Sequence, residues 1–310
     1  MHDLKFSVIV PTYNRAHLIK KTLESLLNQT YDNFEILVID DGSTDDTGDV
    51  VKAIEGPRLF YYKKENAERG AARNFGAQKA TGEYVNFFDS DDIAYSNHLQ
   101  SAFDTLIEFN RPEVFVLNYN YGTPENIISK SGPSFYDINL QIKKGNILSC
   151  DGVFIRKEVI SSYPFSELRE LSATEDFLLW LQLASRYRIY HNNKRTSSII
   201  NHEQRSVIAI KKESLIKRIE LFLKLSTEDQ NIKRFYRGRI NVLKSNSYSY
   251  ISLHLSILND KKGGLKFLWK SLRENPLLFF KKRFFVIMKI MWMNFFKGQV
   301  QEKDKGAFLS

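Results

Sequence analysis

Short apolar runs alternate with amphipathic segments through the N-terminal third of the chain, and this alternation constrains the fold more than any other feature. The runs are rich in β-branched and aromatic residues and cover residues 7–10, 36–39, 59–62 and 83–88. Between the first two, Ile19, Leu23 and Leu26 recur at the spacing of one helix face. Strands that alternate with helices at this spacing predict an α/β fold with a parallel, doubly wound sheet.

The fourth run ends in Asp89-Ser90-Asp91-Asp92. On an extended chain the side chains of Asp89 and Asp91 point the same way, about 7 Å apart at a rise of ~3.3 Å per residue. A turn there would bring both carboxylates to one cation. Carboxylates without neighbouring Cys or His suit Mg²⁺ or Mn²⁺, which keeps coordination positions for phosphate oxygens. The pattern therefore predicts a metal-bound diphosphate at the carboxyl end of a strand, where open α/β sheets bind ligands. The alternative is a solvated acidic turn in which Asp92 caps the next helix.

The first turn excludes two common nucleotide sites. Residues 11–15, Pro-Thr-Tyr-Asn-Arg, contain no glycine, whereas a dinucleotide-binding turn needs G-x-G-x-x-G so that the backbone can approach the pyrophosphate. The chain also lacks a P-loop Gly-Lys-Ser/Thr. Metal and side chains must therefore hold any phosphate.

Bulk properties indicate a cytoplasmic protein with an anionic partner. The chain has 310 residues, one cysteine (Cys150) and a formal net charge of +9. A single cysteine suits a reducing compartment. The start of the chain does not have the pattern of a signal peptide, and no stretch reaches the ~18 apolar residues of a spanning helix. The positive charge points to nucleic acid or an acidic membrane surface.

Four sequence blocks together resemble one family. They are Pro11-Thr12-Tyr13-Asn14-Arg15, Asp40-Asp41-Gly42-Ser43-Thr44-Asp45, Ala71-Ala72-Arg73-Asn74, and Thr81-Gly82-Glu83-Tyr84 leading to Asp89-Ser90-Asp91-Asp92. In this order and spacing they resemble the family-2 inverting glycosyltransferases of GT-A fold, which have a doubly wound mixed sheet. The resemblance implies metal-dependent transfer of a sugar from a nucleoside diphosphate sugar, UDP-linked, to an acceptor hydroxyl. It also implies a saccharide or lipid-linked acceptor in cell-surface polysaccharide or glycolipid assembly.

The resemblance implies a role for each residue of the donor site, which comprises Pro11, Tyr13, Asp41, Arg73, Asp89, Ser90 and Asp91. Tyr13 would lie against the nucleotide base, and Asp41 would accept a hydrogen bond from a uracil N–H. Asp40 would share that role or serve in the turn at the end of the strand.

Arg73 would meet the diphosphate or ribose with its fork of donors. Asp91 would be the direct metal ligand, and Asp89 would bind ribose or a metal-bound water. One block departs from the family, because Ala67-Glu68-Arg69-Gly70 stands where its members carry small, glycine-rich residues.

The acceptor side is expected after residue 110. Residues 120–146 are polar and are interpreted as irregular, and Thr174-Glu175-Asp176 opens a helix. Acids at a helix start are explained by capping alone, but the family places its catalytic base here. We expect Asp176 to be that base, with Glu175 the lesser candidate. His202 is a low-ranked metal ligand, and a surface histidine whose hydrogen bonds are satisfied is the preferred interpretation.

The C-terminal third predicts helices. We expect a GT-A domain over residues 1–210, with a nucleotide-sugar half (1–110) and an acceptor half (111–210). A helical extension follows over 211–276 and an amphipathic basic helix over 277–298. The apolar face of that helix comprises Phe284, Ile287, Met288, Met291, Trp292 and Phe295.

This pattern is typical of a helix that lies on an anionic leaflet, which predicts peripheral association with the inner face of the cell membrane. A helix docked on the protein's own core is the alternative. Nucleic acid is not expected, because the basic residues are interleaved with apolar ones.

Two other functions fit parts of the sequence. A sugar-nucleotide nucleotidyltransferase would also use an acidic metal site, but no glycine-rich triphosphate motif is present. A non-catalytic nucleotide-sugar binder would not need Asp91, Arg73 and Asp176 together.

Overall fold

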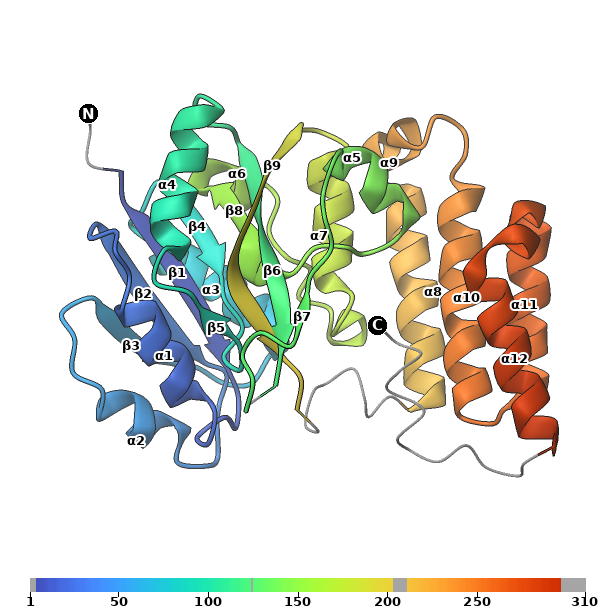
Figure 1. The fold of residues 1–310 in the computed structure, drawn as a ribbon, viewed down its shortest axis with the longest axis horizontal. Coiled ribbons are helices and arrows are strands. Elements are labelled where there is room, and N and C mark those ends of the chain that lie inside the picture. Colours follow the sequence, from blue (N-terminus) through green and yellow to red (C-terminus); the bar gives the residue numbers. More distant parts are fainter. Residues whose placement is uncertain (1–3, 124, 203–210, 297–310) are drawn as a thin grey trace. The chain divides into compact units, whose positions relative to one another are not determined.

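The structure is a computed structural model that describes residues 4–123, 125–202 and 211–296. These residues form two compact units, which we describe separately (Figure 1). Of the described residues, unit 1 comprises 4–142 and 146–202, apart from residue 124. Unit 2 comprises 143–145 and the helices from residue 211 onward.

Unit 1 is built on one mixed sheet. Its strands are β1 (Phe6–Thr12), β2 (Phe34–Asp40), β3 (Leu59–Lys63), β4 (Tyr84–Phe87), β5 (Ile93–Ala94), β6 (Val114–Gly122), β7 (Lys130–Ser131), β8 (Val153–Arg156) and β9 (Ile189–Ile200). The strand order is β3-β2-β1-β4-β8-β6-β9-β5, with β7 paired to β6. Strands β1 to β4 are parallel, and β8 runs antiparallel to both β4 and β6. The predicted α/β class and the mixed sheet implied by the family resemblance are confirmed, whereas the parallel sheet predicted from the alternation alone is wrong, because β8 is antiparallel to its neighbours.

Helices cover both faces of this sheet because alternate strand residues face opposite sides. Val8 and Val10 of β1 belong to a core that also contains residues of α1 (Ile19–Leu27) and α4 (His98–Glu108). Ile9, between them, faces α3 (Glu68–Lys79) on the other side, where a Cβ added at Gly76 would lie 2.4 Å from its Cγ2. Glycine at that position lets α3 lie close to the sheet.

The strand register places the sequence motifs at one edge. Thr12 at the end of β1 is paired with Asp40 at the end of β2, and Phe87 of β4 is paired with Ile9. Because parallel strands end at the same edge, the loops that follow β1, β2 and β4 lie next to one another. The short α2 (Thr47–Lys52) continues the second of these loops.

The second half of unit 1 is more ordered than the sequence suggests. Strand β6 continues to Gly122, and its long parallel pairing with β9 is interrupted only by a register shift near Asn118. The segment predicted to be irregular, 120–146, contains the end of β6, β7, α5 (Ile138–Gln141) and the 3₁₀ turn η1 (Ile142–Lys144). The prediction missed these elements because they are too short for a periodic pattern. The elements that follow are η2 (Cys150–Gly152), α6 (Lys157–Ser162), η3 (Arg169–Leu171) and α7 (Glu175–Ala184).

Unit 2 is helical, with α8 (Lys212–Glu228), α9 (Gln230–Phe235), α10 (Asn241–Ile257), α11 (Lys261–Glu274), η4 (Pro276–Phe280) and α12 (Lys282–Phe296). Small residues let α10 and α11 pack closely. The Ser252 hydroxyl donates to the carbonyl of Gly264 at 2.8 Å, and the hydroxyls of Ser245 and Ser271 lie 3.0 Å apart.

Helix α12 docks on unit 2 by part of the face that was predicted to contact lipid. Ile287 and Ile290 are buried with Leu253 and Leu268, each contributing roughly 1.5–3 kcal/mol. The Asn294 amide also donates to the carbonyl of Ser256 at 2.7 Å.

Within the predicted lipid-facing side of the helix, Ile287 is buried against the protein, as the docked-helix alternative expects, whereas Met288 and Trp292 remain exposed. The side chain of Phe295 and the predicted end of the helix at 297–298 lie outside the described residues. Among the described residues, no helix combines the length and the hydropathy needed to cross a membrane.

Candidate active site

The strand-end loops of unit 1 enclose a cavity of about 500 Å³. All seven residues expected in the donor site line it, namely Pro11, Tyr13, Asp41, Arg73, Asp89, Ser90 and Asp91. The other lining residues include Arg15, Asn66, Glu68 and Arg69. Asp176 and His202 are not among the lining residues, but His202 contacts the lining residue Asp91, and Asp176 follows Glu175, which bonds the lining residue Arg73.

The first loop of the cavity is held by the second. Asn14 adopts a left-handed backbone (φ 52°), which asparagine tolerates better than most residues. Its amide N–H donates to the Ser43 hydroxyl at 2.9 Å, and its side-chain oxygen accepts from the Thr44 N–H at 2.8 Å. This pairing leaves the ring of Tyr13 in the cavity wall and 47% exposed, as a residue that stacks on a ligand would be.

Adjacent acids at the end of β2 have different partners. Asp40 is fully buried, and its carboxylate accepts from the Ser43 N–H at 2.7 Å and the Tyr61 hydroxyl at 2.6 Å. Asp41 lines the cavity, and Oδ1 accepts from Lys64 at 2.7 Å and the Ala67 N–H at 3.0 Å. Of the two roles considered for Asp40, the turn role is the one that fits these contacts.

Arg73 links the two sides of the site. Its side chain is only 2% exposed, Nη2 donates to Asp89 Oδ1 at 2.9 Å, and Nη1 donates to Glu175 Oε1 at 2.8 Å. The guanidinium group that was expected to bind the diphosphate therefore already donates hydrogen bonds to two carboxylates. Glu175 is also buried, and Arg69 lies 3.9 Å from the same oxygen. The buried arginine fixes the loop after β4, through Asp89, relative to the start of α7.

His202 contacts Asp91, in the loop after β4, directly. Its Nε2 lies 2.9 Å from Asp91 Oδ2, and its side chain is only 10% exposed. Arg15 lies 4.0 Å from the same carboxylate oxygen. The preferred interpretation was a satisfied surface histidine, and the structure pairs His202 with Asp91 at a largely buried position. Metal binding by His202 stays a prediction. Carboxylate oxygens suit Mg²⁺ or Mn²⁺, so the Asp91 carboxylate at the cavity wall has the chemistry to bind such an ion, and His202 is the side chain that contacts it.

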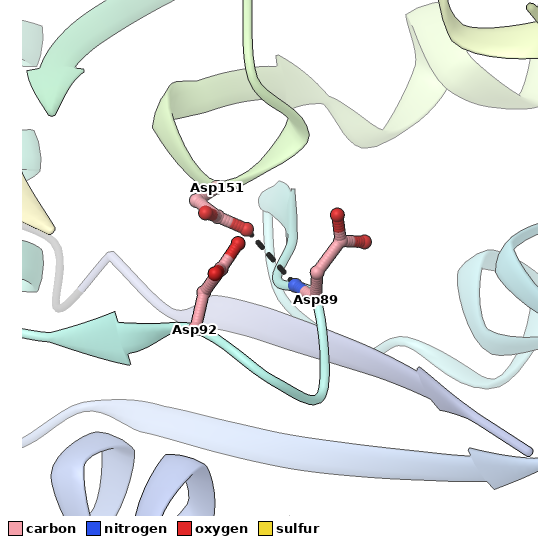
Figure 2. Close-up of side chains that lie close together, drawn as sticks. All are labelled: Asp89, Asp92 and Asp151. Carbon is pink, nitrogen blue, oxygen red and sulfur yellow. Dashed lines mark hydrogen bonds between the residues drawn. The ribbon is translucent and has the colours of Figure 1, made fainter. Parts of the chain in front are cut away.

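A cluster of three acidic side chains includes one residue of the cavity wall, Asp89 (Figure 2). Asp89, Asp92 and Asp151 each place an oxygen within 4.8 Å of the others. Asp92 and Asp151 are fully buried, and their carboxyl groups face each other, while the carboxylate of Asp89 points away. Asp151 Oδ1 accepts from the Asp89 N–H at 2.9 Å, and Asp92 Oδ1 accepts from the Ile200 N–H at 2.7 Å. These two bonds hold the loop after β4, which contains Asp89 and Asp92, against η2 and β9.

Burial and the charge of Asp89 raise the pKa of Asp151 to about 7, and a hydrogen bond with Asp92 opposes the rise. Two carboxyl groups that share a hydrogen bond need one proton between them. Asp92 is fully buried and accepts a hydrogen bond from β9, so the interpretation of Asp92 as a helix cap in a solvated turn is wrong. Sequence reasoning missed Asp151, and its only signal was an acid directly before a buried strand.

Asp176 is the second residue of α7 and is half-buried. The Asn146 side chain donates to its Oδ2 at 3.0 Å, and the Phe177 N–H donates to its Oδ1 at 2.6 Å. Burial, together with the neighbouring Glu175 charge, raises the pKa of Asp176 to about 6. The pKa of a general base works best near the operating pH, so this carboxylate has suitable chemistry. Asn146 was also missed, since a lone asparagine in a polar segment carries no signal.

Glu68 occupies the position that departs from the family pattern. It has a left-handed backbone (φ 72°), where only glycine is free of strain. Its carboxylate lies 3.7 Å from Arg169 and accepts from the Ser172 hydroxyl at 3.0 Å. This loop thus keeps a glycine-type conformation with a charged residue at the cavity wall.

Several known glycosyltransferases are similar to this chain in sequence. An uncharacterized glycosyltransferase of Rickettsia bellii is 31% identical over 209 residues, which are 64% of this chain and 29% of that protein. The chain thus spans about a third of the first curated relatives it matches. The Escherichia coli protein WfaP, named a UDP-Glc:alpha-D-GlcNAc-diphosphoundecaprenol beta-1,3-glucosyltransferase, is 29% identical over 79% of this chain and 96% of its own length.

The fold also has solved counterparts. The crystal structure of S. aureus TarS 1-349 in complex with UDP-GlcNAc superposes with a TM-score of 0.61 at 21% identity, covering 96% of this chain and 93% of that one. The likeness shows that unit 1 has the GT-A fold that the sequence blocks predicted.

Residues 7–163 match the family model described as Glycosyl transferase family 2. That span is half of the 310-residue chain, and it contains all the residues that line the cavity, including Arg73, Asp89 and Asp91. The chain therefore belongs to glycosyl transferase family 2.

Proposed function

We propose that this protein transfers a sugar from a UDP-sugar to an acceptor hydroxyl with inversion at the anomeric carbon. One observation carries the proposal: Arg73 bonds at once to the metal motif at Asp89 and to Glu175, beside Asp176. A donor-binding group and a candidate base are thereby fixed relative to each other, as a single displacement requires.

The donor would lie in the cavity of unit 1. Tyr13 offers an exposed ring for the base, and Asp41 offers carboxylate oxygens at its edge. Asp91 would hold Mg²⁺ or Mn²⁺, with Asp89 and His202 at its sides. The ion, when bound, neutralises negative charge on the diphosphate.

Asp176 would act on the acceptor. Its carboxylate takes the proton from the acceptor hydroxyl as that oxygen forms a bond to the anomeric carbon. The bond from this carbon to the diphosphate oxygen breaks on the opposite face, and its electron pair leaves with the diphosphate. One displacement by one nucleophile inverts the configuration. Glu175, buried and bound to Arg73, serves as an anchor in this scheme.

We propose further that the acceptor is a lipid-linked saccharide and that the protein works on the cytoplasmic face of an anionic membrane, in the assembly of a surface polysaccharide or glycolipid. The name of WfaP, which includes a diphosphoundecaprenol acceptor, supports this class of acceptor. The net charge of +9 supports the anionic surface.

A donor panel tests the function. Purified protein is incubated with UDP-glucose, UDP-N-acetylglucosamine and GDP-mannose, with Mn²⁺ or with chelator, and release of nucleoside diphosphate is measured. We expect slow, Mn²⁺-dependent hydrolysis of a UDP-sugar that Asp176→Asn abolishes. Binding of a UDP-sugar without any turnover would instead indicate a non-catalytic binder, and release of inorganic pyrophosphate from a nucleoside triphosphate would indicate a nucleotidyltransferase.

A further inference from the structure

We propose that α11 and α12 of unit 2 present one composite face that binds an anionic lipid bilayer, with Trp269 and Trp292 as its anchors. The sequence placed membrane contact on 277–298 alone. The inference rests on the membrane part of the proposed function and assigns it to residues on two helices.

Large apolar side chains are exposed along these helices and the turn between them, namely Leu265, Trp269, Phe280, Phe285, Met288 and Trp292. Trp269 is 68% exposed and Trp292 is 65% exposed, whereas Trp180, the third tryptophan of the chain, is fully buried. Soluble surfaces rarely carry so many large apolar groups together. Exposed tryptophans of this kind are typical of the boundary between lipid and water.

Helix geometry places the two stripes on the same side of the pair. Leu268 of α11 is buried in one cluster with residues of α12, and a Cβ added at Gly264 would lie 2.7 Å from the Met291 side chain. The start of α11 is therefore next to the end of α12, so the helices run antiparallel.

Each exposed tryptophan follows directly after a residue at this seam, since Trp269 follows Leu268 and Trp292 follows Met291. One step along a helix turns the side chain by about 100°. In antiparallel neighbours that turn leads both side chains to the same side of the pair, away from the buried Ile287 and Ile290.

Charge identifies the partner. Residues 261–296 hold nine Lys and Arg and one acid, a net +8 out of the chain's +9. Lys262, Lys266, Lys282 and Lys289 are exposed around the apolar stripes. Lysine stems can lie along an apolar surface while their ammonium groups reach anionic headgroups. A second copy of the chain would bring a like charge against this face, so lipid is favoured over self-association.

Vesicle sedimentation tests the proposal with the full chain. Phosphatidylcholine vesicles with and without phosphatidylglycerol are compared, and only the anionic ones should bind. A triple variant, Lys266→Glu, Lys282→Glu and Lys289→Glu, should weaken binding by about a hundredfold or more, given about fivefold for each lysine near an anionic surface. The double variant Trp269→Ser, Trp292→Ser should also release the protein. Tyr136→Ala, which removes a 64% exposed aromatic from unit 1, is the matched control and should bind normally.

Fluorescence locates the contact. Brominated phosphatidylcholine in the anionic vesicles should quench part of the tryptophan emission. Trp269→Phe and Trp292→Phe should each reduce the quenched fraction, and the buried Trp180 should supply the unquenched remainder. Unchanged quenching in both variants would overturn the proposal, as would vesicle binding that survives the double serine variant. Dimerisation in the absence of vesicles that the double serine variant abolishes would also overturn it and identify a second copy as the occupant.

UDP affinity and transfer to a soluble acceptor, measured on every variant, separate the two proposals. A variant that loses vesicle binding but keeps both measurements supports the face. A wild-type protein that binds vesicles but transfers no sugar would leave the face intact and contradict the proposed reaction.

Discussion

Two acidic segments of unit 1, the loop after β4 and the start of α7, follow the same arrangement. In each, one acid is buried and bonded to protein groups while its neighbour is more accessible. Asp92 bonds the Ile200 N–H and Asp91 lines the cavity, whereas Glu175 bonds Arg73 and Asp176 is half-buried. In both segments, bonds made by the buried acid hold in place the backbone that carries its more accessible neighbour.

Arg73 connects the two segments, because it bonds Asp89 on one side and Glu175 on the other. Successive residues of a helix point about 100° apart, so Glu175 can reach the arginine while Asp176 points elsewhere. Variants that exchange the roles of anchor and reactive acid, or that shift the pKa of one of them, test the comparison.

The largest effect is expected at α7. Asp176→Asn keeps the size and polarity of the side chain but cannot take a proton, so transfer should fall by ~10²–10⁴-fold. Mn²⁺-dependent UDP binding should barely change, because the donor groups lie on other elements. Glu175→Gln, the matched variant of the anchor, should keep more transfer activity. A larger loss in Glu175→Gln would assign the base to that residue.

In the loop after β4, Asp91→Asn should lose Mn²⁺-dependent UDP affinity by at least ~10-fold, while its melting temperature stays close to wild type. Titration calorimetry with UDP, with and without Mn²⁺, measures the first quantity. If Asp91→Asn still showed the full Mn²⁺ effect, the metal would have to bind elsewhere.

Substitution of Asp92, the buried acid of the same loop, should lower the stability of the fold, unlike Asp91→Asn. Asp92→Ala leaves the buried Ile200 N–H without its side-chain partner and removes one of the partners of the Asp151 carboxyl. An unpaired buried polar group costs about 1–3 kcal/mol, so thermal unfolding should occur at a lower temperature than in wild type or Asp91→Asn. Equal melting temperatures for the two variants would remove the distinction between anchor and reactive acid.

The pH profile gives a smaller but directional effect. Because Asp176 must be deprotonated to accept a proton, transfer should fall as the pH drops through its pKa of about 6. Asn146→Ala removes a hydrogen bond that lowers this pKa, so the acid limb should move to higher pH. Glu175→Gln removes a neighbouring negative charge and should move it to lower pH. Rate measurements on both variants check the sign, and shifts in the same direction would contradict the assignment.

The smallest effect is expected at the edge of the cavity. Tyr13→Ala should weaken donor binding by about 1–2 kcal/mol, within the range for a lost aromatic contact, and should leave the pH profile unchanged. An effect limited to acceptor affinity would show that Tyr13 does not contact the base.

The local pattern of the chain was sufficient for the first half of unit 1. Strands β1 and β2 are short, continuous apolar runs, and helix α1 between them has apolar residues at the helical period of 3.6. The family resemblance of the motifs, and not the strand pattern, predicted that Tyr13, Asp41 and Asp89 belong to one donor site, and all three line the same cavity. The amphipathic character of α12 was likewise readable from its sequence, but not which side docks.

Only the tertiary structure decided the partners that come from distant positions. His202 reaches Asp91 across 111 residues, and Arg73 reaches Glu175 across 102. Asp151 lies beneath Asp89 because β8 pairs antiparallel with β4. A local sequence pattern reflects propensity and periodicity within a segment. Which charged side chain meets which depends on the order of strands in the sheet, and that order results from burying the whole core at once.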